Sequence, residues 1–171
     1  KLIGYDASTP DPEGGVIRRG ADGKTPNGVL EEFAAMPYMV KFLTPTTQEG
    51  KDNFLKRGLE MAKSYGYTTA NEGRMFGAMH ADMENAAARG LLDIDFNGWM
   101  DYSNRAEIDR GFATAYTNHY RLAGLKITLD GSPQGRTAWR NVAYLIPPDG
   151  QELGYKGYPA IPDTKQVEAY L

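Results

Sequence analysis

Strand-like and helix-like segments alternate along the middle of this chain, and that alternation limits its fold more than any other feature. The hydrophobic periodicity first predicts a helix, followed by a strand at 67–72, a helix at 75–89, a strand at 91–100, a helix at 104–120 and a strand that ends at Asp130. Each strand with its helix takes roughly 25–35 residues, the length of a crossover between parallel strands. The sequence therefore predicts an α/β fold with parallel strands and right-handed crossovers.

Turn signals divide the chain into three predicted segments. Residues 1–45 are rich in turns and contain a β-hairpin, and residues 46–143 hold the β/α units. Residues 144–171 form an irregular Pro- and Gly-rich tail that leads into a helix near Asp163. A complete (β/α)8 barrel takes roughly 250 residues. The three predicted β/α units would supply part of such a TIM-like barrel, less than half of its eight units.

The first segment carries the clearest hairpin pattern. A strand at 16–19 is followed by a turn, and residues 28–30 are predicted to pair back on it. A short helix at 31–36 is predicted to end before Pro37, because a residue that precedes proline disfavours helical backbone angles.

The first long helix has a cap signal at its start. Thr46 or Thr47 is predicted to be the residue that caps it, since a threonine hydroxyl accepts a hydrogen bond from the first turn. In the following helical segment Met75, Met79 and Met83 recur at helical spacing, which is typical of a hydrophobic core.

Composition excludes several classes of function. The net charge of −3, without a basic run, gives no support for a nucleic-acid partner. No apolar stretch approaches the roughly 18 residues that cross a bilayer, so we expect a soluble protein without a membrane partner, cytoplasmic or periplasmic. The chain has no cysteine, which excludes disulfides and thiolate ligands within it. It starts at Lys1 without an initiator methionine, as in a processed product or a piece of a longer protein.

The last predicted strand contains an unusual lysine. Strand side chains alternate, so Lys126, Thr128 and Asp130 are predicted to share one face. A buried ammonium must be paired, neutralised or exposed to water, because an uncompensated one is costly. Two interpretations stay open: a site at the carboxyl end of a barrel strand, where catalytic groups gather, or the solvent-facing side of a half-covered sheet.

Other charged residues have both functional and structural interpretations. Glu72 ends a predicted strand, which suits a site residue or an acid at the start of a helix. Asp93 and Asp95 are predicted to share a strand face, as an acid–base pair, as ligands or as plain exposed carboxylates. Arg136, in the glycine-rich turn at 131–136, can hold a substrate carboxylate or form a salt bridge.

The two histidines do not form a recognisable metal motif. His80 falls within a predicted helix and His119 near the end of another. Neither belongs to a His-x-His or His-Glu-x-x-His array, so a complete zinc site cannot be assembled from this chain. We therefore interpret both as structural or surface histidines.

Residues 125–138, LKITLDGSPQGRTA, resemble the VK-x-F-x-DGS-x-x-x-RTA signature of amidohydrolase family 3. Residues 9–15 (TPDPEGG), 26–32 (PNGVLEE) and 66–73 (GYTTANEG) are similar to the same family, in the same order. The branch it resembles most contains N-substituted formamide deformylases and proteins described as exoenzyme regulatory proteins.

The resemblance implies a metal-dependent hydrolase on a TIM-like barrel that cleaves a C–N bond of a small amide-type substrate. In this superfamily a lysine on the fourth barrel strand can be carbamylated, and its carbamate then bridges two divalent metals; Lys126 matches that position. The metal is expected to be zinc, and it would activate a water molecule. Asp130 and Arg136 would shape the substrate site, with Glu72 as a further substrate-binding candidate.

The sequence also departs from the family pattern. The His-x-His pair of the first strand, the later histidines and the aspartate of the eighth strand are absent. By this registration the three predicted strands correspond to barrel strands two, three and four. The chain is therefore predicted to be an internal fragment that, alone, neither binds the metal centre nor turns over substrate.

Two alternatives remain open from the sequence. One is a non-catalytic binding or regulatory module that has kept an amidohydrolase scaffold. The other is a small independent α/β domain whose exposed sheet edges are satisfied by self-association. The flanking sequence and the sedimentation behaviour of the chain discriminate between them.

Overall fold

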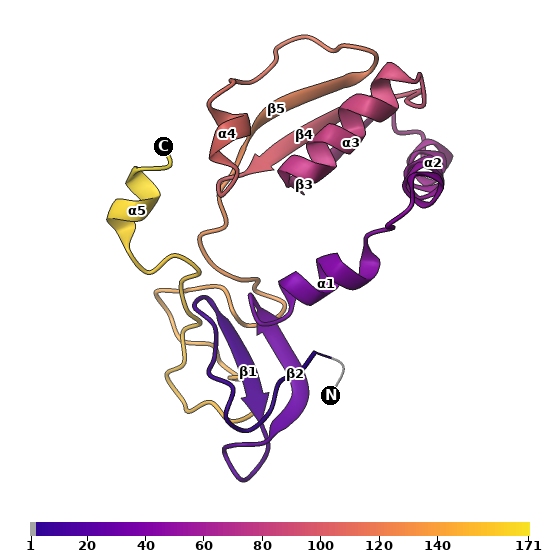
Figure 1. Cartoon of the computed structure of the whole chain (residues 1–171). Coiled ribbons are helices and arrows are strands. Elements are labelled where there is room, and N and C mark those ends of the chain that lie inside the picture. The colour runs from indigo at the N-terminus through magenta and orange to yellow at the C-terminus, as the bar shows by residue number, and fades with distance from the viewer. Residues whose placement is uncertain (1–2) are drawn as a thin grey trace. The chain divides into compact units, whose positions relative to one another are not determined.

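The computed structural model describes residues 3–171 and divides the chain into two compact units. One unit is formed by Lys1–Leu43 together with Thr128–Leu171, and the other by Thr44–Ile127. Along the chain the elements are β1 (Gly15–Arg19), β2 (Pro26–Glu32), α1 (Met36–Leu43), α2 (Gln48–Ser64), β3 (Thr69–Met75), α3 (Gly77–Ala88), β4 (Asp95–Asp101), α4 (Arg105–Ile108), β5 (Tyr120–Lys126) and α5 (Thr164–Glu168) (Figure 1). Within the described residues no helix is long and apolar enough to cross a membrane.

The Thr44–Ile127 unit is built on a three-stranded sheet in the order β3-β4-β5. Both neighbouring pairs are parallel, which confirms the parallel strands predicted from the sequence. The strands themselves are displaced from the predicted ranges. Leu92 and Ile94, for example, are buried but precede β4, because apolar alternation continues through the turn that leads into the strand. The observed arrangement is an α/β fold consistent with part of a TIM-like barrel.

The core of this unit lies between the sheet and its helices. Its buried members are Leu59, Met75, Met83, Ala87, Leu92, Ile94, Met100, Tyr120 and Leu122, with Met79 packed against them. The predicted core positions of the three methionines are therefore confirmed, but Met75 is the last residue of β3 and does not belong to α3 as predicted. Helix α3 packs on β4 and β5 (Figure 1). Phe54 of α2 lies outside this core, since it is 67% exposed.

Helix α2 begins where its cap signal predicted. The backbone of Thr47 is extended, and its hydroxyl oxygen accepts a hydrogen bond from the Gly50 N–H at 3.1 Å. Of the two threonines that the sequence offered, the structure thus selects Thr47.

Thr47→Ala is expected to lower the free energy of unfolding by about 1 kcal/mol, because the Gly50 N–H loses its acceptor. Thr46→Ala is the matched control and should change stability by less than about 0.5 kcal/mol. Urea denaturation of both variants measures the difference. Equal losses in the two variants would contradict the assigned cap.

The helix predicted at 104–120 is wrong. Only α4 forms there, and the rest of the crossover to β5 is a loop. Gly111, Asn118 and His119 have positive φ angles of 86°, 49° and 67°, which a right-handed helix excludes. The loop is held by its neighbour strand instead: the Ala113 N–H donates to the Leu122 carbonyl oxygen at 2.8 Å. Contacts with a later strand therefore override the local helical pattern.

The other unit contains the predicted hairpin. β1 and β2 pair antiparallel, and Arg18 on β1 forms a two-point ion pair with Glu31 on β2, with Nε 2.6 Å from Oε1. The predicted helix at 31–36 is wrong, because β2 continues to Glu32 and α1 begins at Met36. Pro37 lies in the first turn of α1, where its missing N–H costs no helical hydrogen bond.

The C-terminal helix agrees with its predicted start. Asp163 caps α5 by accepting a hydrogen bond from the Lys165 N–H at 2.9 Å. Before it, residues 144–162 contain no helix or strand, as the Pro- and Gly-rich composition predicted.

Candidate functional site

The carboxyl ends of the three parallel strands bring charged residues to one edge of the sheet. Asp101 and Lys126 are the last residues of β4 and β5 and are register partners. Arg74 is the residue before the last in β3. In α/β folds this edge is where functional side chains gather.

Asp101 is the most buried charged group at this edge, with 1% of its surface exposed. Its Oδ2 accepts a hydrogen bond from Arg74 Nε at 2.6 Å, and its Oδ1 accepts one from the Ser103 N–H at 3.0 Å. The Ser103 hydroxyl donates to the same Oδ1. A carboxylate can be buried here because a guanidinium and two further donors compensate its charge.

Lys126 lies beside this pair but is solvent-exposed. Its carbonyl oxygen accepts a hydrogen bond from the Tyr102 N–H at 3.0 Å, so the backbone at the end of β5 is fixed next to the turn that follows Asp101. The exposed ammonium requires no buried counter-charge. The sequence left three ways to accommodate this lysine, namely pairing, neutralisation or exposure to water, and the structure shows that it is exposed.

The shared polar face of Lys126, Thr128 and Asp130 is not formed. β5 ends at Lys126, and the chain then leaves the sheet. Beyond it the Ala160 N–H donates to the Leu129 carbonyl oxygen at 2.8 Å, and Asp130 forms a bridge with Pro159. Pairing with the C-terminal tail thus replaces the strand continuation that alternation predicted.

Asp130 and Arg136 have structural contacts within the unit that contains the hairpin. Asp130 Oδ2 accepts a hydrogen bond from the Trp139 N–H at 2.9 Å, and Arg136, whose φ is 57°, donates from Nη1 to the Pro147 carbonyl oxygen at 3.2 Å. Gly131 is required by close packing, since a Cβ there would lie 2.0 Å from the Thr137 hydroxyl oxygen. The turn at 131–136 is therefore a tightly packed structural turn.

Glu72 does not end its strand. It lies inside β3, partly buried, and its Oε1 accepts a hydrogen bond from the Arg74 N–H at 3.0 Å. The strand continues to Met75, so the residue that reaches the carboxyl edge is Arg74. This corrects the position that the sequence predicted for Glu72.

The paired aspartates of the sequence analysis are also separated. β4 begins at Asp95, whereas Asp93 precedes the strand and forms an ion pair with Lys63 of α2. Asp95 instead pairs with His119, whose Nδ1 lies 2.9 Å from Asp95 Oδ1. His119 precedes β5 and does not belong to a helix, contrary to the prediction.

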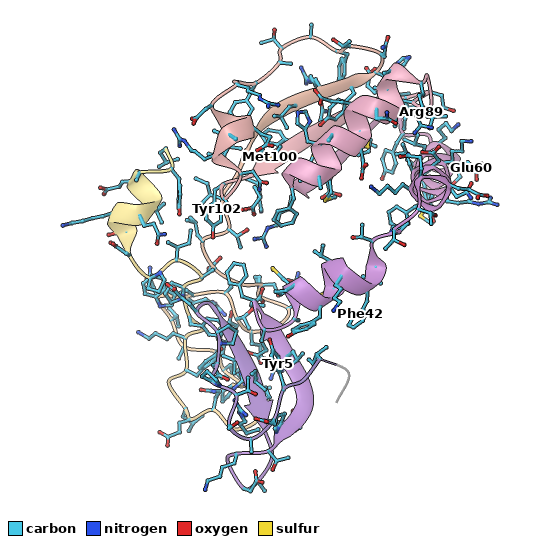
Figure 2. The ribbon with its side chains drawn as sticks, in the orientation of Figure 1. Tyr5, Phe42, Glu60, Arg89, Met100 and Tyr102 are labelled. Atoms are coloured by element: carbon cyan, nitrogen blue, oxygen red, sulfur yellow. The ribbon has the colours of Figure 1, made fainter. Side chains whose placement is uncertain are left out.

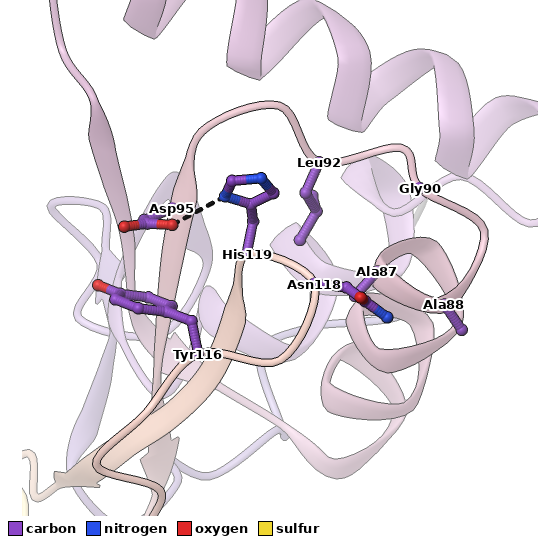
Figure 3. A pocket seen from close by; sticks show the side chains of 8 residues that line it. All are labelled: Ala87, Ala88, Gly90, Leu92, Asp95, Tyr116, Asn118 and His119. Carbon is purple, nitrogen blue, oxygen red and sulfur yellow. Dashed lines mark hydrogen bonds and ion pairs between the residues drawn. The ribbon is translucent and has the colours of Figure 1, made fainter.

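Asp95 and His119 line a cavity of about 460 Å³ (Figure 3). Figure 3 shows the His119 ring between Asp95 and Leu92, with Tyr116 beside the carboxylate. The cavity lies at the amino ends of β4 and β5, opposite the edge that carries Asp101 and Lys126. In barrels this opposite edge is associated with stability, so the pair is best interpreted as an anchor for the loop before β5.

Sequence reasoning missed Arg74, Asp101 and Ser103. Their signal was present, since each lies at or just beyond the end of a predicted strand. The strand ends were placed too early, however, and the ion pair joins residues 27 positions apart. No local pattern reports such a contact.

The charged edge does not amount to a metal site. Among residues 3–171, no three or more His, Asp or Glu side chains lie close enough together to hold a metal ion. Asp101 is the register partner of Lys126, and its two carboxylate oxygens already accept hydrogen bonds from Arg74 and Ser103.

Comparisons with known proteins give a family from the sequence and a fold from the structure. The sequence profile of the amidohydrolase family matches residues 1–171. The structure is similar to an uncharacterized metal-dependent hydrolase from Pyrococcus horikoshii OT3, with a TM-score of 0.65 and 17% identity over 90% of this chain and 31% of that one. A second such hydrolase, from Pyrococcus furiosus, gives a TM-score of 0.65 and 14% identity over 90% of this chain and 32% of the other. The chain thus spans about a third of their length. No curated protein sequence matches it significantly.

Proposed function

Because the chain belongs to the amidohydrolase family, we propose that it forms part of a longer metal-dependent hydrolase that cleaves a carbon–nitrogen bond of the amide type. The observation that carries this proposal is the position of Lys126 at the carboxyl end of a parallel strand, exposed and beside Asp101. The substrate would be a small amide-type molecule. Since the chain spans about a third of its solved relatives, the activity is proposed for the longer protein and the chain alone is expected to be inactive.

Lys126 is proposed to act as a metal ligand in its carbamylated form. Its neutral amine would add carbon dioxide and lose a proton, and the cation would thereby become an anionic oxygen donor. An exposed side chain suits this step, since both carbon dioxide and the metal can reach it. When bound, a divalent metal, expected to be zinc, would polarise the substrate carbonyl and activate water.

Asp130, Arg136 and Glu72 are proposed to bind substrate in the longer protein. Arg136 supports this best, because its contact with the Pro147 carbonyl oxygen uses one nitrogen of a guanidinium that has five N–H donors. Asp130 and Glu72 each hold a backbone N–H, so their replacement would also loosen the turn or the strand that carries them.

The test uses the full-length gene product with Lys126→Ala and, as matched control, Lys156→Ala at another exposed lysine. Lys126→Ala is expected to lose bound metal and to lower hydrolysis of simple N-substituted amides by more than about 100-fold, a larger effect than loss of an outer-shell contact. With ¹³C-labelled carbon dioxide, the carbamate NMR signal of the wild type should disappear in this variant alone.

Unchanged metal content and hydrolysis in Lys126→Ala would reject the role of this lysine. A wild-type protein that neither holds metal nor hydrolyses amides would instead favour the alternative, a binding or regulatory module on an amidohydrolase scaffold. The shortage of metal donors within residues 3–171 is the observation that keeps this alternative in view.

A further inference from the structure

A second cavity, of about 380 Å³, lies between α3, the loop that follows α4 and the first half of β5. Its position follows from the short crossover between β4 and β5. A regular β/α unit would place a long helix over these strands, whereas here only the four residues of α4 are helical. The lining residues of interest are His80 and Glu84 from α3 and Tyr120 from β5.

His80 is held in one orientation at the wall of this cavity. It is 9% exposed, and its Nδ1 lies 2.7 Å from the hydroxyl oxygen of Tyr120. The Tyr120 hydroxyl in turn donates to the sulfur of Met75 at 3.1 Å. In the tautomer in which Nδ1 carries the proton, Nδ1 donates to the Tyr120 oxygen and Nε2 of His80 carries the lone pair.

Tyr120 is itself buried, with 5% of its surface exposed, so its hydroxyl is held in place against His80. The orientation of the His80 ring is fixed by packing and hydrogen bonding together.

The carboxylate of Glu84 lies one helical turn after His80 on α3 and close to its ring. Nε2 of His80 lies 3.6 Å from Oε1 of Glu84, beyond hydrogen-bond distance. Two ligands of one zinc ion, each about 2.1 Å from it, lie about 3.4 Å apart in a tetrahedral site. The spacing of the two donors is close to that value. Glu84, with 60% of its side chain exposed, leaves the position open to water.

We propose that His80 Nε2 and a carboxylate oxygen of Glu84 bind a divalent transition-metal ion at the mouth of this cavity, with water completing its coordination. An imidazole and a carboxylate favour zinc, cobalt or nickel over magnesium or calcium. Tyr120 supplies the outer hydrogen bond that orients a metal-binding histidine.

The surrounding charges come from three elements. Glu107 at α4 and Arg110 in the following loop also line the cavity, as does Arg121 of β5. Arg121 is turned to other partners: its Nε donates to Asn97 Oδ1 at 2.6 Å and its Nη1 to the Thr114 carbonyl oxygen at 2.8 Å. Of the other charged residues in the lining, Arg110 is a cation and Glu107 a further carboxylate.

This position is separate from the proposed role of Lys126. His80 contacts Tyr120, the first residue of β5, and Lys126 is the last residue of the same strand. Six residues of strand span about 20 Å, too far for one metal centre. The inference therefore stands or falls independently of the proposed hydrolase.

The test is a zinc titration of the 171-residue protein by calorimetry, with circular dichroism to compare the folds of all variants. Glu84→Gln should weaken binding about tenfold or more, and Tyr120→Phe by about 10- to 100-fold. Asp95→Asn is the matched control, because it removes the acid of the other His–acid pair and should leave binding unchanged. Lys126→Ala should also leave binding unchanged, and magnesium should not compete.

Nickel identifies the ligand directly. The protein has two histidines, so the ring protons of His80 and His119 are distinguishable by NMR, and paramagnetic broadening should affect His80 first. Unchanged zinc affinity in Glu84→Gln, or broadening of His119 before His80, would overturn the proposal. Because Glu84 is exposed, its variant is decisive even if Tyr120→Phe fails to fold.

Discussion

Replacing Asp101 by asparagine is expected to lower the free energy of unfolding of the Thr44–Ile127 unit by about 3 kcal/mol, the lower end of the range for breaking a buried ion pair. The two oxygens of Asp101 each face donors, from Arg74 on one side and Ser103 on the other. An asparagine amide group must point its N–H atoms at one of these sets of donors. The variant thus removes the negative charge that compensates Arg74. It also places the N–H group of the asparagine against another hydrogen-bond donor, from Arg74 or from Ser103.

The effect is measured by urea denaturation followed by the fluorescence of Trp99, which lies in this unit. The protein has two tryptophans, so a Trp139→Phe background leaves Trp99 as the only reporter. Asp109→Asn is the control: its carboxylate pairs with Arg105 at 2.8 Å, but both side chains are more than half exposed. That variant should change stability by less than about 0.5 kcal/mol. Similar losses of unfolding free energy in Asp101→Asn and Asp109→Asn would show that burial of the Arg74–Asp101 pair does not add to its contribution to stability.

Met100→Ala is expected to have an effect of similar size, about 3 kcal/mol, from the cavity left in the core. Met100 lies on β4 (Figure 2) and is fully buried, and it packs in the cluster that also contains Met75 and Tyr120. The surrounding strands are held by ladder hydrogen bonds on both sides, so the space can close only in part. Most of the lost contacts are therefore not replaced.

Two further variants test whether the loss of stability comes from the side-chain volume that Met100→Ala removes from the core. Met61→Ala changes the same side chain at a position of α2 that is 66% exposed, and it should stay within about 0.5 kcal/mol of the wild type. Met100→Leu keeps most of the volume and should cost less than about 1.5 kcal/mol. The same fluorescence titration measures all three. A Met100→Leu variant as unstable as Met100→Ala would contradict the cavity explanation.

Features that depend on neighbouring residues were predictable from the sequence. The cap at Thr47, the cap at Asp163 and the β1–β2 hairpin all rest on contacts between residues close in the chain. The parallel sheet was also predictable, because strand and helix segments alternate at the length of a crossover. Lys126 was correctly placed on the last strand of this sheet, but the strand ends there and not at Asp130 as predicted.

Features that depend on distant residues were not predictable. The crossover before β5 has an acceptable local helix pattern, yet Leu122 and Arg121 bind its backbone and keep it extended. The alternation through Asp130 is a valid strand pattern as well, but Pro159 and Ala160 provide the hydrogen-bonding partners instead of the sheet. In both cases a contact with a later segment outweighs local propensity.

The candidate site shows the same division. Sequence alone determined the α/β class, the family resemblance and the candidacy of Lys126, because these depend on residue type and spacing. Only the tertiary structure showed that Lys126 is exposed beside the Arg74–Asp101 pair, and that His80 and Tyr120 meet across 40 positions. The physical reason is that charge compensation and burial are properties of groups in space, and strand pairing decides which groups become neighbours.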